Sequence, residues 1–399
     1  MMRPGDRPPG DITLRIVTRL LAGFVVLLLL GIAAAWVADP VVVSRMGAAL
    51  TGGSTGVAAP VTGGPPAEVP VARPGKGSID AKVVEESIAW ATENGSHALL
   101  VWHNGALEVE HYFPGYDRNT RTPTQSMQKS LLAILVGIAV RDGFIASVDD
   151  PAGRYLAEWR DDERGAITIR QLLQQANGLD FPTLDFATGG EFMQIMLGDN
   201  LEAVILGQPL ATTPGTRFEY TNVGPQVLGI ILERATGKRY AEYLSESLWS
   251  RIGADDAVVT LDSSARRTAR VFCCLDATAR SWLQVGLLHL NAGVYNGEQV
   301  VPANWMRDVA APSSTNPNYG YLTWLGTQHV AERSYNSKAG TVARHSEPFA
   351  ARDVIYFDGF GGQRVYIVPS KSLVIVRTGD IDTGWDDAWL PNRYIRAIS

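Results

Sequence analysis

The sequence predicts a mixed α/β domain of the α+β type, in which an antiparallel sheet from the N- and C-terminal segments is flanked by helices. Short β-type runs stand at both ends of the globular part, at 98–113 and 354–377, and the segment between them has helical periodicity. Asn104-Gly105 separates two apolar runs, which is the strongest short signal for a β-hairpin. A large helical region is therefore predicted to be inserted into one sheet.

The fold prediction includes an N-terminal transmembrane helix at residues 20–38. This stretch is apolar and uncharged, and about 1.5 Å of rise per residue gives it roughly 28 Å, enough to cross a bilayer core. The arginines within residues 1–19 predict a cytoplasmic N-terminus. A signal peptide cleaved near Ala33-Ala34-Ala35 is the alternative. Either reading places the remaining chain outside the cytoplasm, in a periplasmic or extracellular location.

Residues 39–78 follow the span and are rich in Gly, Pro and Ala. They have no helical or strand periodicity, which predicts a flexible linker. Residues 52–56 match G-x-S-x-G, but that motif needs a strand before it and a helix after it, and neither is predicted here. Residues 79–399 form the predicted globular domain.

The elements of this domain are predicted from periodicity, turn residues and stop glycines. Strands are expected at 98–103, 106–113, 354–357, 363–368 and 373–377. Helices are expected at 79–94, 126–143, 167–176, 223–236, 239–252, 277–293 and 383–398.

Charge and cysteine content exclude several functions. The net charge is −6 and no run of Lys or Arg offers a track for phosphates, so nucleic acid is not an expected partner. The two cysteines, Cys273 and Cys274, are adjacent, which does not suit a zinc site. Because adjacent cysteines rarely bridge each other, they are expected to be small buried apolar residues. No metal or organic cofactor is predicted.

Ser126 and Lys129 are the first candidates for chemistry. Residues three apart lie on one helix face, and a lysine with a lowered pKa can take the proton of a serine hydroxyl. The alternative is an N-cap serine with an exposed lysine one turn later. Two observations favour chemistry: this is the only S-x-x-K in a chain with six lysines, and the following helix is apolar on nearly every face.

Two further stretches supply possible partners. Tyr220 and Asn222 form the only Y-x-N; a phenol near a lysine is expected to lose its proton more easily, and an amide can hold a carbonyl or the lysine. Gly359, Gly361 and Gly362 leave bare backbone around Phe360, whose N–H is expected to join that of Ser126 in an oxyanion hole. A bulge or a plain hairpin turn is the alternative for these glycines.

Together, SMQKS, PGTRFEYTN and the GFGGQ-to-VIV ending resemble the serine hydrolases related to class C β-lactamases, penicillin-binding proteins and their esterase relatives, over residues 85–399. The resemblance implies that Ser126 is acylated, that Lys129 and Tyr220 share its proton, and that Asn222 belongs to the site.

The third motif departs from the family. The family has Lys or His, then Thr or Ser, then Gly, whereas Phe357-Asp358-Gly359 stands here. The missing cation argues against penicillin or cephalosporin hydrolysis and favours esters or short amides. Asp358 is expected to attract a cationic amine of the substrate. His345 in RHSEPF is a displaced alternative to the third motif, but no glycine follows it.

The sequence thus predicts a membrane-tethered serine hydrolase that acts on a small ester or amide through an acyl-enzyme. The alternatives are a D-amino-acid peptidase or β-lactamase acting on cell-wall-type substrates and, in another class, a catalytically silent cell-wall or ligand-binding module.

Overall fold

The computed structural model describes residues 17, 20–21, 31, 37–51, 55–66, 68–73, 77–185, 187 and 189–398. The chain divides into two compact units, Met1–Thr55 with Asp185–Asp199, and Gly56–Leu184 with Asn200–Ser399. The second unit carries every residue that the sequence nominated for chemistry.

The first unit contains helix α2 (Pro40–Leu50) and helix α6 (Glu191–Leu197). The Asp39 carboxylate caps α2 by accepting from the N–H of Val42 at 2.9 Å. Arg45 donates to the carbonyls of Leu197 and Gly198, which end α6. These contacts join the two helices within this unit.

The predicted transmembrane helix and the membrane-anchored location that depends on it are corrected by the structure. In the part of the chain that the structure describes, no helix is long and apolar enough to cross a membrane. Helix α2 has 11 residues, roughly 16 Å, against about 30 Å of bilayer core. Residues 22–30 and 32–36 of the predicted span lie outside the described residues.

The larger sheet of the second unit is antiparallel and has the order β3-β2-β14-β13-β12-β9. Its strands are β2 (Ser96–His103), β3 (Ala106–Tyr112), β9 (Trp324–Leu325), β12 (Ile355–Gly359), β13 (Gln363–Val368) and β14 (Leu373–Gly379). Val101 of β2 lies opposite Ile375 of β14, so the N- and C-terminal segments share one sheet, as predicted. Asn104 and Gly105 both have positive φ, which the tight β2–β3 turn requires.

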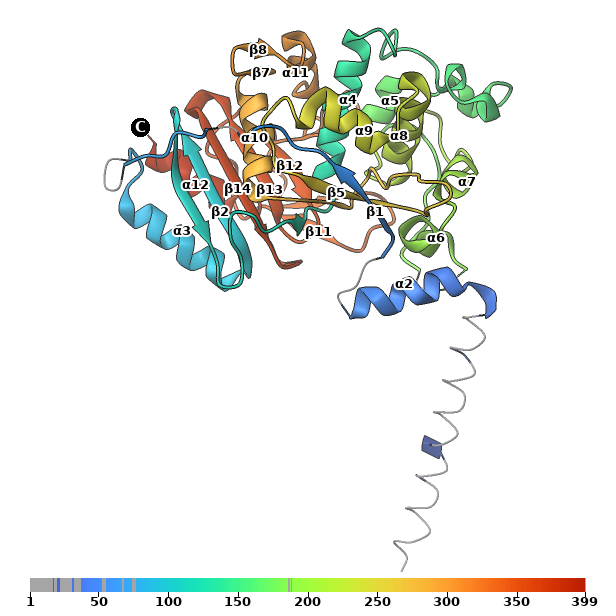
Figure 1. Cartoon of the computed structure of the whole chain (residues 1–399), viewed down its shortest axis with the longest axis horizontal. Coiled ribbons are helices and arrows are strands. Elements are labelled where there is room, and N and C mark those ends of the chain that lie inside the picture. Colours follow the sequence, from blue (N-terminus) through green and yellow to red (C-terminus); the bar gives the residue numbers. More distant parts are fainter. Residues whose placement is uncertain are drawn as a thin grey trace, which may run out of the picture. The chain divides into compact units, whose positions relative to one another are not determined.

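Helices cover both faces of this sheet (Figure 1). Helix α10 (Ala279–Leu290) packs on one face, where Gly286 lies against Val365 and Val374. Helices α3 (Ala81–Glu93) and α12 (Trp389–Ala397) pack on the other, which includes Ile375. Alternate side chains of β14 therefore pack into two apolar layers, one on each face of the sheet.

The inserted region is mainly helical. It holds α4 (Met127–Arg141), α5 (Ile169–Leu173), α7 (Leu201–Leu206), α8 (Val223–Thr236) and α9 (Tyr240–Leu244), and α11 (Ala303–Val309) follows α10. Helix α4 is buried from Met127 to Ala139 and packs against both α8 and β12. This burial places the first turn of α4 between the helical region and the large sheet.

A second sheet, of order β1-β5-β6-β4, was not predicted. Its strands are β1 (Val57–Val61), β4 (Thr122–Pro123), β5 (Ala257–Leu261) and β6 (Leu275–Ala277). Residues 57–61 belong to the stretch expected as a flexible linker, yet they pair with β5 and bury Ala59 and Val61. A five-residue strand with two inward side chains carries too weak a pattern to stand out in a Gly- and Pro-rich stretch.

Candidate active site

Ser126 stands at the start of α4, where β4 leads into the helix. Its side chain makes no capping hydrogen bond, so the plain N-cap alternative does not describe it. Gln125 before it has φ of 51°, a strained conformation for a residue other than glycine. Thr124 is held by the carbonyl of Leu275, which accepts from its N–H at 3.3 Å and its hydroxyl at 2.6 Å. The local chain therefore presents the Ser126 hydroxyl inward from a fixed turn.

Lys129 lies one turn later and is 1% exposed. Its Nζ donates to Ser126 Oγ at 2.8 Å, Asn222 Oδ1 at 2.9 Å and the carbonyl of Phe272 at 2.9 Å. All three acceptors are uncharged. Burial therefore lowers the pKa of Lys129 from 10.5 to about 7, although the negative charge of Asp358 raises it in part. Near neutral pH this amine can lose a proton and then accept one from Ser126.

Tyr220 lies beside this pair, with its ring centroid 4.8 Å from Lys129 Nζ. Its ring packs against Tyr319, Trp324 and Tyr335. Burial and the negative charge of Asp358 raise the pKa of Tyr220, and a hydrogen bond with Ser126 lowers it in part. The expectation that the neighbouring lysine would make this phenol acidic is therefore wrong. A neutral phenol suits proton donation.

Two buried glutamines, which the sequence did not single out, form hydrogen bonds with the backbone of this site. Gln175 donates to the carbonyl of Thr221 at 2.9 Å and accepts from its N–H at 3.3 Å. The Gln226 side chain donates to the carbonyl of Ala269 and accepts from the N–H of Val271, just before Phe272. Each carboxamide thus fixes the backbone next to a residue that contacts Lys129 or Tyr220. Only long-range contacts could have revealed them.

The glycine-rich turn approaches the start of α4. A β-carbon on Gly359 would lie 2.5 Å from the Thr124 carbonyl oxygen and 3.1 Å from Met127 Cγ, so only glycine fits there. Phe360 follows, with 41% of its surface exposed. Strand β12 therefore brings the backbone of Gly359 next to the turn that carries Ser126. The oxyanion hole formed by the N–H groups of Ser126 and Phe360 stays a prediction.

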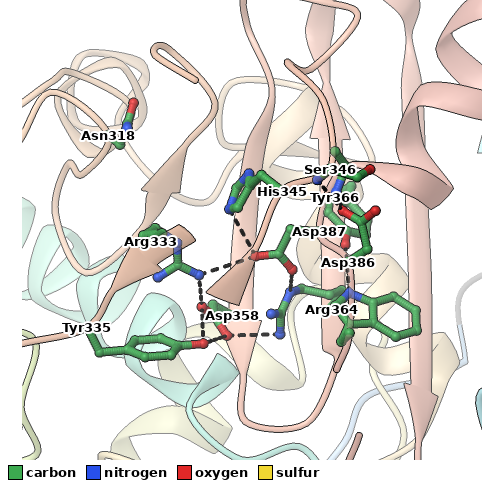
Figure 2. A network of polar contacts seen from close by, with 12 residues as sticks. Asn318, Arg333, Tyr335, His345, Ser346, Asp358, Arg364, Tyr366, Asp386 and Asp387 are labelled. Atoms are coloured by element: carbon green, nitrogen blue, oxygen red, sulfur yellow. Dashed lines mark hydrogen bonds and ion pairs between the residues drawn. The ribbon is translucent and has the colours of Figure 1, made fainter. Parts of the chain in front are cut away.

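Phe357 and Asp358, the positions of the altered third motif, point to opposite sides of β12. The Phe357 ring is fully buried against Trp282 and His289, so it does not face the site. Asp358 is 3% exposed and accepts from Arg333, Arg364 and Tyr335, as Figure 2 shows. Its charge is already matched by two guanidinium groups. The expectation that Asp358 attracts a substrate amine is therefore corrected.

Asp358 belongs to a buried ion cluster, which we define as Arg333, Asp358, Arg364 and Asp387 (Figure 2). Asp387 accepts from Arg364 Nε at 2.6 Å and from Arg333 at 3.2 Å. His345 Nε2 is 3.4 Å from Asp387, so this candidate joins the ion cluster and not the Ser126 site. The cluster ties the hairpin of β10 (Glu332–Ser334) and β11 (Val342–Arg344) to the large sheet.

Cys273 and Cys274 form a disulfide, so the expectation that they are separate apolar side chains is wrong. They follow Phe272, whose carbonyl accepts from Lys129, and precede Leu275, whose carbonyl holds Thr124. Cys274 has φ of 73°, which turns the chain sharply between these two contacts. The disulfide therefore joins two residues of the segment whose backbone carbonyls bond Lys129 and Thr124.

The chain is similar to several known proteins over most of its length. The Beta-lactamase family model matches residues 89–388. A 6-aminohexanoate-dimer hydrolase from Paenarthrobacter ureafaciens is 29% identical over 311 residues, which are 74% of each chain. A family VIII carboxylesterase structure has a TM-score of 0.61 at 16% identity and covers 82% of this chain and 98% of its own. A penicillin binding protein from Bacillus halodurans has a TM-score of 0.56 at 16% identity, covering 80% and 99%.

Proposed function

Because the chain belongs to the Beta-lactamase family, we propose that Ser126 forms an acyl-enzyme in the hydrolysis of carboxylic esters or short amides. The family match and the relatives' names make the protein a serine-type amide or ester hydrolase. One observation carries the assignment of Ser126: its Oγ lies 2.8 Å from a buried lysine that has only neutral acceptors around it. That lysine can be neutral at the working pH and take the serine proton.

In the proposed acylation, the Ser126 Oγ–carbon bond forms as the hydroxyl proton passes to Lys129 Nζ. The oxyanion accepts from the N–H groups of Ser126 and Phe360. Tyr220, kept neutral by its raised pKa, donates its proton to the leaving amine or alkoxide, and Lys129 returns a proton to Tyr220. Water then attacks the acyl carbon, its proton passes through Lys129, and Ser126 Oγ is reprotonated as the acid leaves.

The surroundings of β12 favour esters and amides over β-lactams. At the position of the family's third-motif cation, Phe357 faces the core. A phenylalanine there supplies no positive charge to hold a substrate carboxylate beside the scissile bond. The relative named for 6-aminohexanoate-dimer hydrolysis supports a linear amide of an ω-amino acid as one substrate to test. A D-amino-acid peptidase or β-lactamase, and a silent binding module, remain the rival proposals.

A substrate panel on the full chain tests this proposal. The panel contains p-nitrophenyl butyrate, the 6-aminohexanoate dimer and nitrocefin, each with wild type and Ser126→Ala. We expect turnover of the ester or the amide, a loss of at least ~1,000-fold in Ser126→Ala, and much slower nitrocefin hydrolysis. Full activity in Ser126→Ala rejects the nucleophile. Nitrocefin as the best substrate favours the β-lactamase alternative, and no turnover of any substrate favours the silent module.

A further inference from the structure

A short segment between β10 and β11 forms hydrogen bonds with the backbone of Tyr220. We call residues Tyr335–Lys338 the strap. The carbonyl of Tyr335 accepts from the N–H of Tyr220 at 3.1 Å. Asn336 Nδ2 donates to the Tyr220 carbonyl at 2.9 Å. Both backbone polar groups of the proposed proton donor are therefore bonded to the strap.

The opposite side of the same loop is held by Gln175. Besides its two bonds to Thr221, Gln175 accepts through its carbonyl from the N–H of Glu219 at 2.8 Å. Residues 219–221 thus lie between a fully buried support and the strap. Because Gln175 bonds Glu219 and Thr221 but not Tyr220 between them, the strap is what fixes the Tyr220 peptide groups themselves.

The two ends of the strap are anchored by very different interactions. At one end the Tyr335 hydroxyl donates to Asp358 at 3.0 Å, inside the buried ion cluster. At the other end Lys338 Nζ donates to Asp180 at 2.6 Å and to the carbonyl of Phe181 at 2.7 Å. The side chains of Lys338 and Asp180 are 36% and 40% exposed. An ion pair this exposed is weak and is screened by salt.

Asn336 connects the weak anchor to Tyr220. Its Oδ1 accepts from the N–H of Lys338 at 2.9 Å while its Nδ2 bonds Tyr220, so one carboxamide joins both. We propose that Asn336 is a positioning residue for Tyr220 and that the Lys338–Asp180 pair is the latch that holds it in place. This inference rests on the proposed function, since it gives Tyr220 the role of proton donor.

The main test is a double-mutant cycle on the full chain with the best substrate of the panel. Asn336→Asp keeps the acceptor for Lys338 and loses the donor to Tyr220; Asn336→Ala loses the donor without adding charge. We expect both to lower kcat by about 10-fold with KM within ~3-fold, because a small displacement of a reacting group is costly. In the Tyr220→Phe background neither should cost further activity, since the positioned hydroxyl is gone.

The outcomes separate the two proposals. Wild-type kcat in both Asn336 variants, with Tyr220→Phe impaired, overturns the positioning role and leaves the proposed function intact. An additive loss in the Tyr220→Phe background shows a merely structural effect and also overturns it. Full activity in Tyr220→Phe instead rejects the role of Tyr220 in the proposed function.

A second variant keeps the inference falsifiable if the Asn336 variants do not fold. Raising NaCl from 50 to 500 mM should lower wild-type kcat about 2–3-fold, because the latch is exposed to screening. Lys338→Met should start at this lower kcat and show little salt dependence. Lys82→Met, which removes a lysine of α3 with 80% exposure, is the matched control and should behave as wild type. Equal salt dependence in wild type and Lys338→Met contradicts the latch.

Discussion

Lys129 and Asp358 are both buried charged residues beside the Ser126 turn, and their surroundings differ in one respect. Lys129 donates to a hydroxyl, an amide and a backbone carbonyl, none of which carries charge. Asp358 accepts from two guanidinium groups and a phenol. The lysine therefore loses much of its tendency to stay charged, whereas the carboxylate keeps a matched partner set.

The difference teaches how to tell a reactive buried charge from a structural one. Desolvation, which the charge of Asp358 offsets only in part, brings the pKa of Lys129 to about 7, where its protonation can change during a reaction. In the ion cluster, charge–charge attraction lowers the pKa of Asp387 despite its burial, the Arg364 guanidinium being the main cause. Groups that stay charged throughout serve to hold β12 and the β10–β11 hairpin together.

Replacing Lys129 should break the comparison most visibly. We expect Lys129→Met to lower kcat/KM by about 10²–10⁴-fold, the range of a lost general base. The free energy of unfolding should stay the same or rise, because a buried amine without a charged partner is replaced by an apolar chain. Denaturant unfolding and steady-state kinetics measure both. If the variant stays active or is strongly destabilised, Lys129 has a structural role and not a reactive one.

Replacing Asp387 should have the opposite signature. Asp387→Ala leaves Arg333 and Arg364 with Asp358 as their one remaining carboxylate in the ion cluster, so one buried positive charge is unmatched. We expect a loss of about 3–5 kcal/mol in the free energy of unfolding. Urea or guanidinium titration gives this value. The activity of molecules that remain folded should fall less than in Lys129→Met. A change below ~1 kcal/mol would show that the ion cluster does not stabilise the sheet.

The pH dependence sharpens the same comparison. Neutral Lys129 is the proposed base, so kcat/KM should fall about 10-fold per pH unit below its pKa of about 7. Asp358→Asn removes a charge that raises this pKa, so the acid limb should move to lower pH. Between about pH 7 and pH 10.5, Lys129 is mostly neutral in the folded chain and mostly protonated in the unfolded chain. The free energy of unfolding should therefore rise with pH in this range. An acid limb that moves to higher pH in Asp358→Asn would contradict this assignment.

The smallest effect is expected at the surface. Arg396 and Glu347 form an ion pair in which both side chains are more than a third exposed. Arg396→Gln should therefore change the free energy of unfolding by only about 0–1 kcal/mol, because water and salt screen the pair. The same denaturant titration serves as the control for Asp387→Ala. A loss as large as that of Asp387→Ala would show that burial does not decide how much these ion pairs contribute to the free energy of unfolding.

The sequence revealed the parts of the fold and site that depend on local patterns. The helix predicted at 223–236 matches α8 at both ends, and the Asn104-Gly105 hairpin forms as expected. The resemblance to class C β-lactamase-related hydrolases is confirmed by the family match. Local spacing also brought Ser126 and Lys129 together, because residues three apart share a helix face.

What the sequence did not reveal depends on residues far apart. Arg333, a partner of Asp358, comes from β10, and position 333 carries no pattern that links it to β12. Gln175 and Gln226 resemble ordinary helix residues until the fold brings their amides to the backbone. The direction of the Tyr220 pKa depends on burial and Asp358, whereas the sequence suggested only the lysine.

Covalent labelling tests the central claim most directly. The full chain is incubated with a fluorophosphonate, and intact mass with peptide mapping locates the adduct in wild type, Lys129→Met and Lys82→Met. We predict one adduct per chain on Ser126, formed at the same rate in Lys82→Met and at least ~100-fold more slowly in Lys129→Met. An adduct on another residue, or wild-type labelling of Ser126 in Lys129→Met, would contradict the claim that Lys129 activates Ser126.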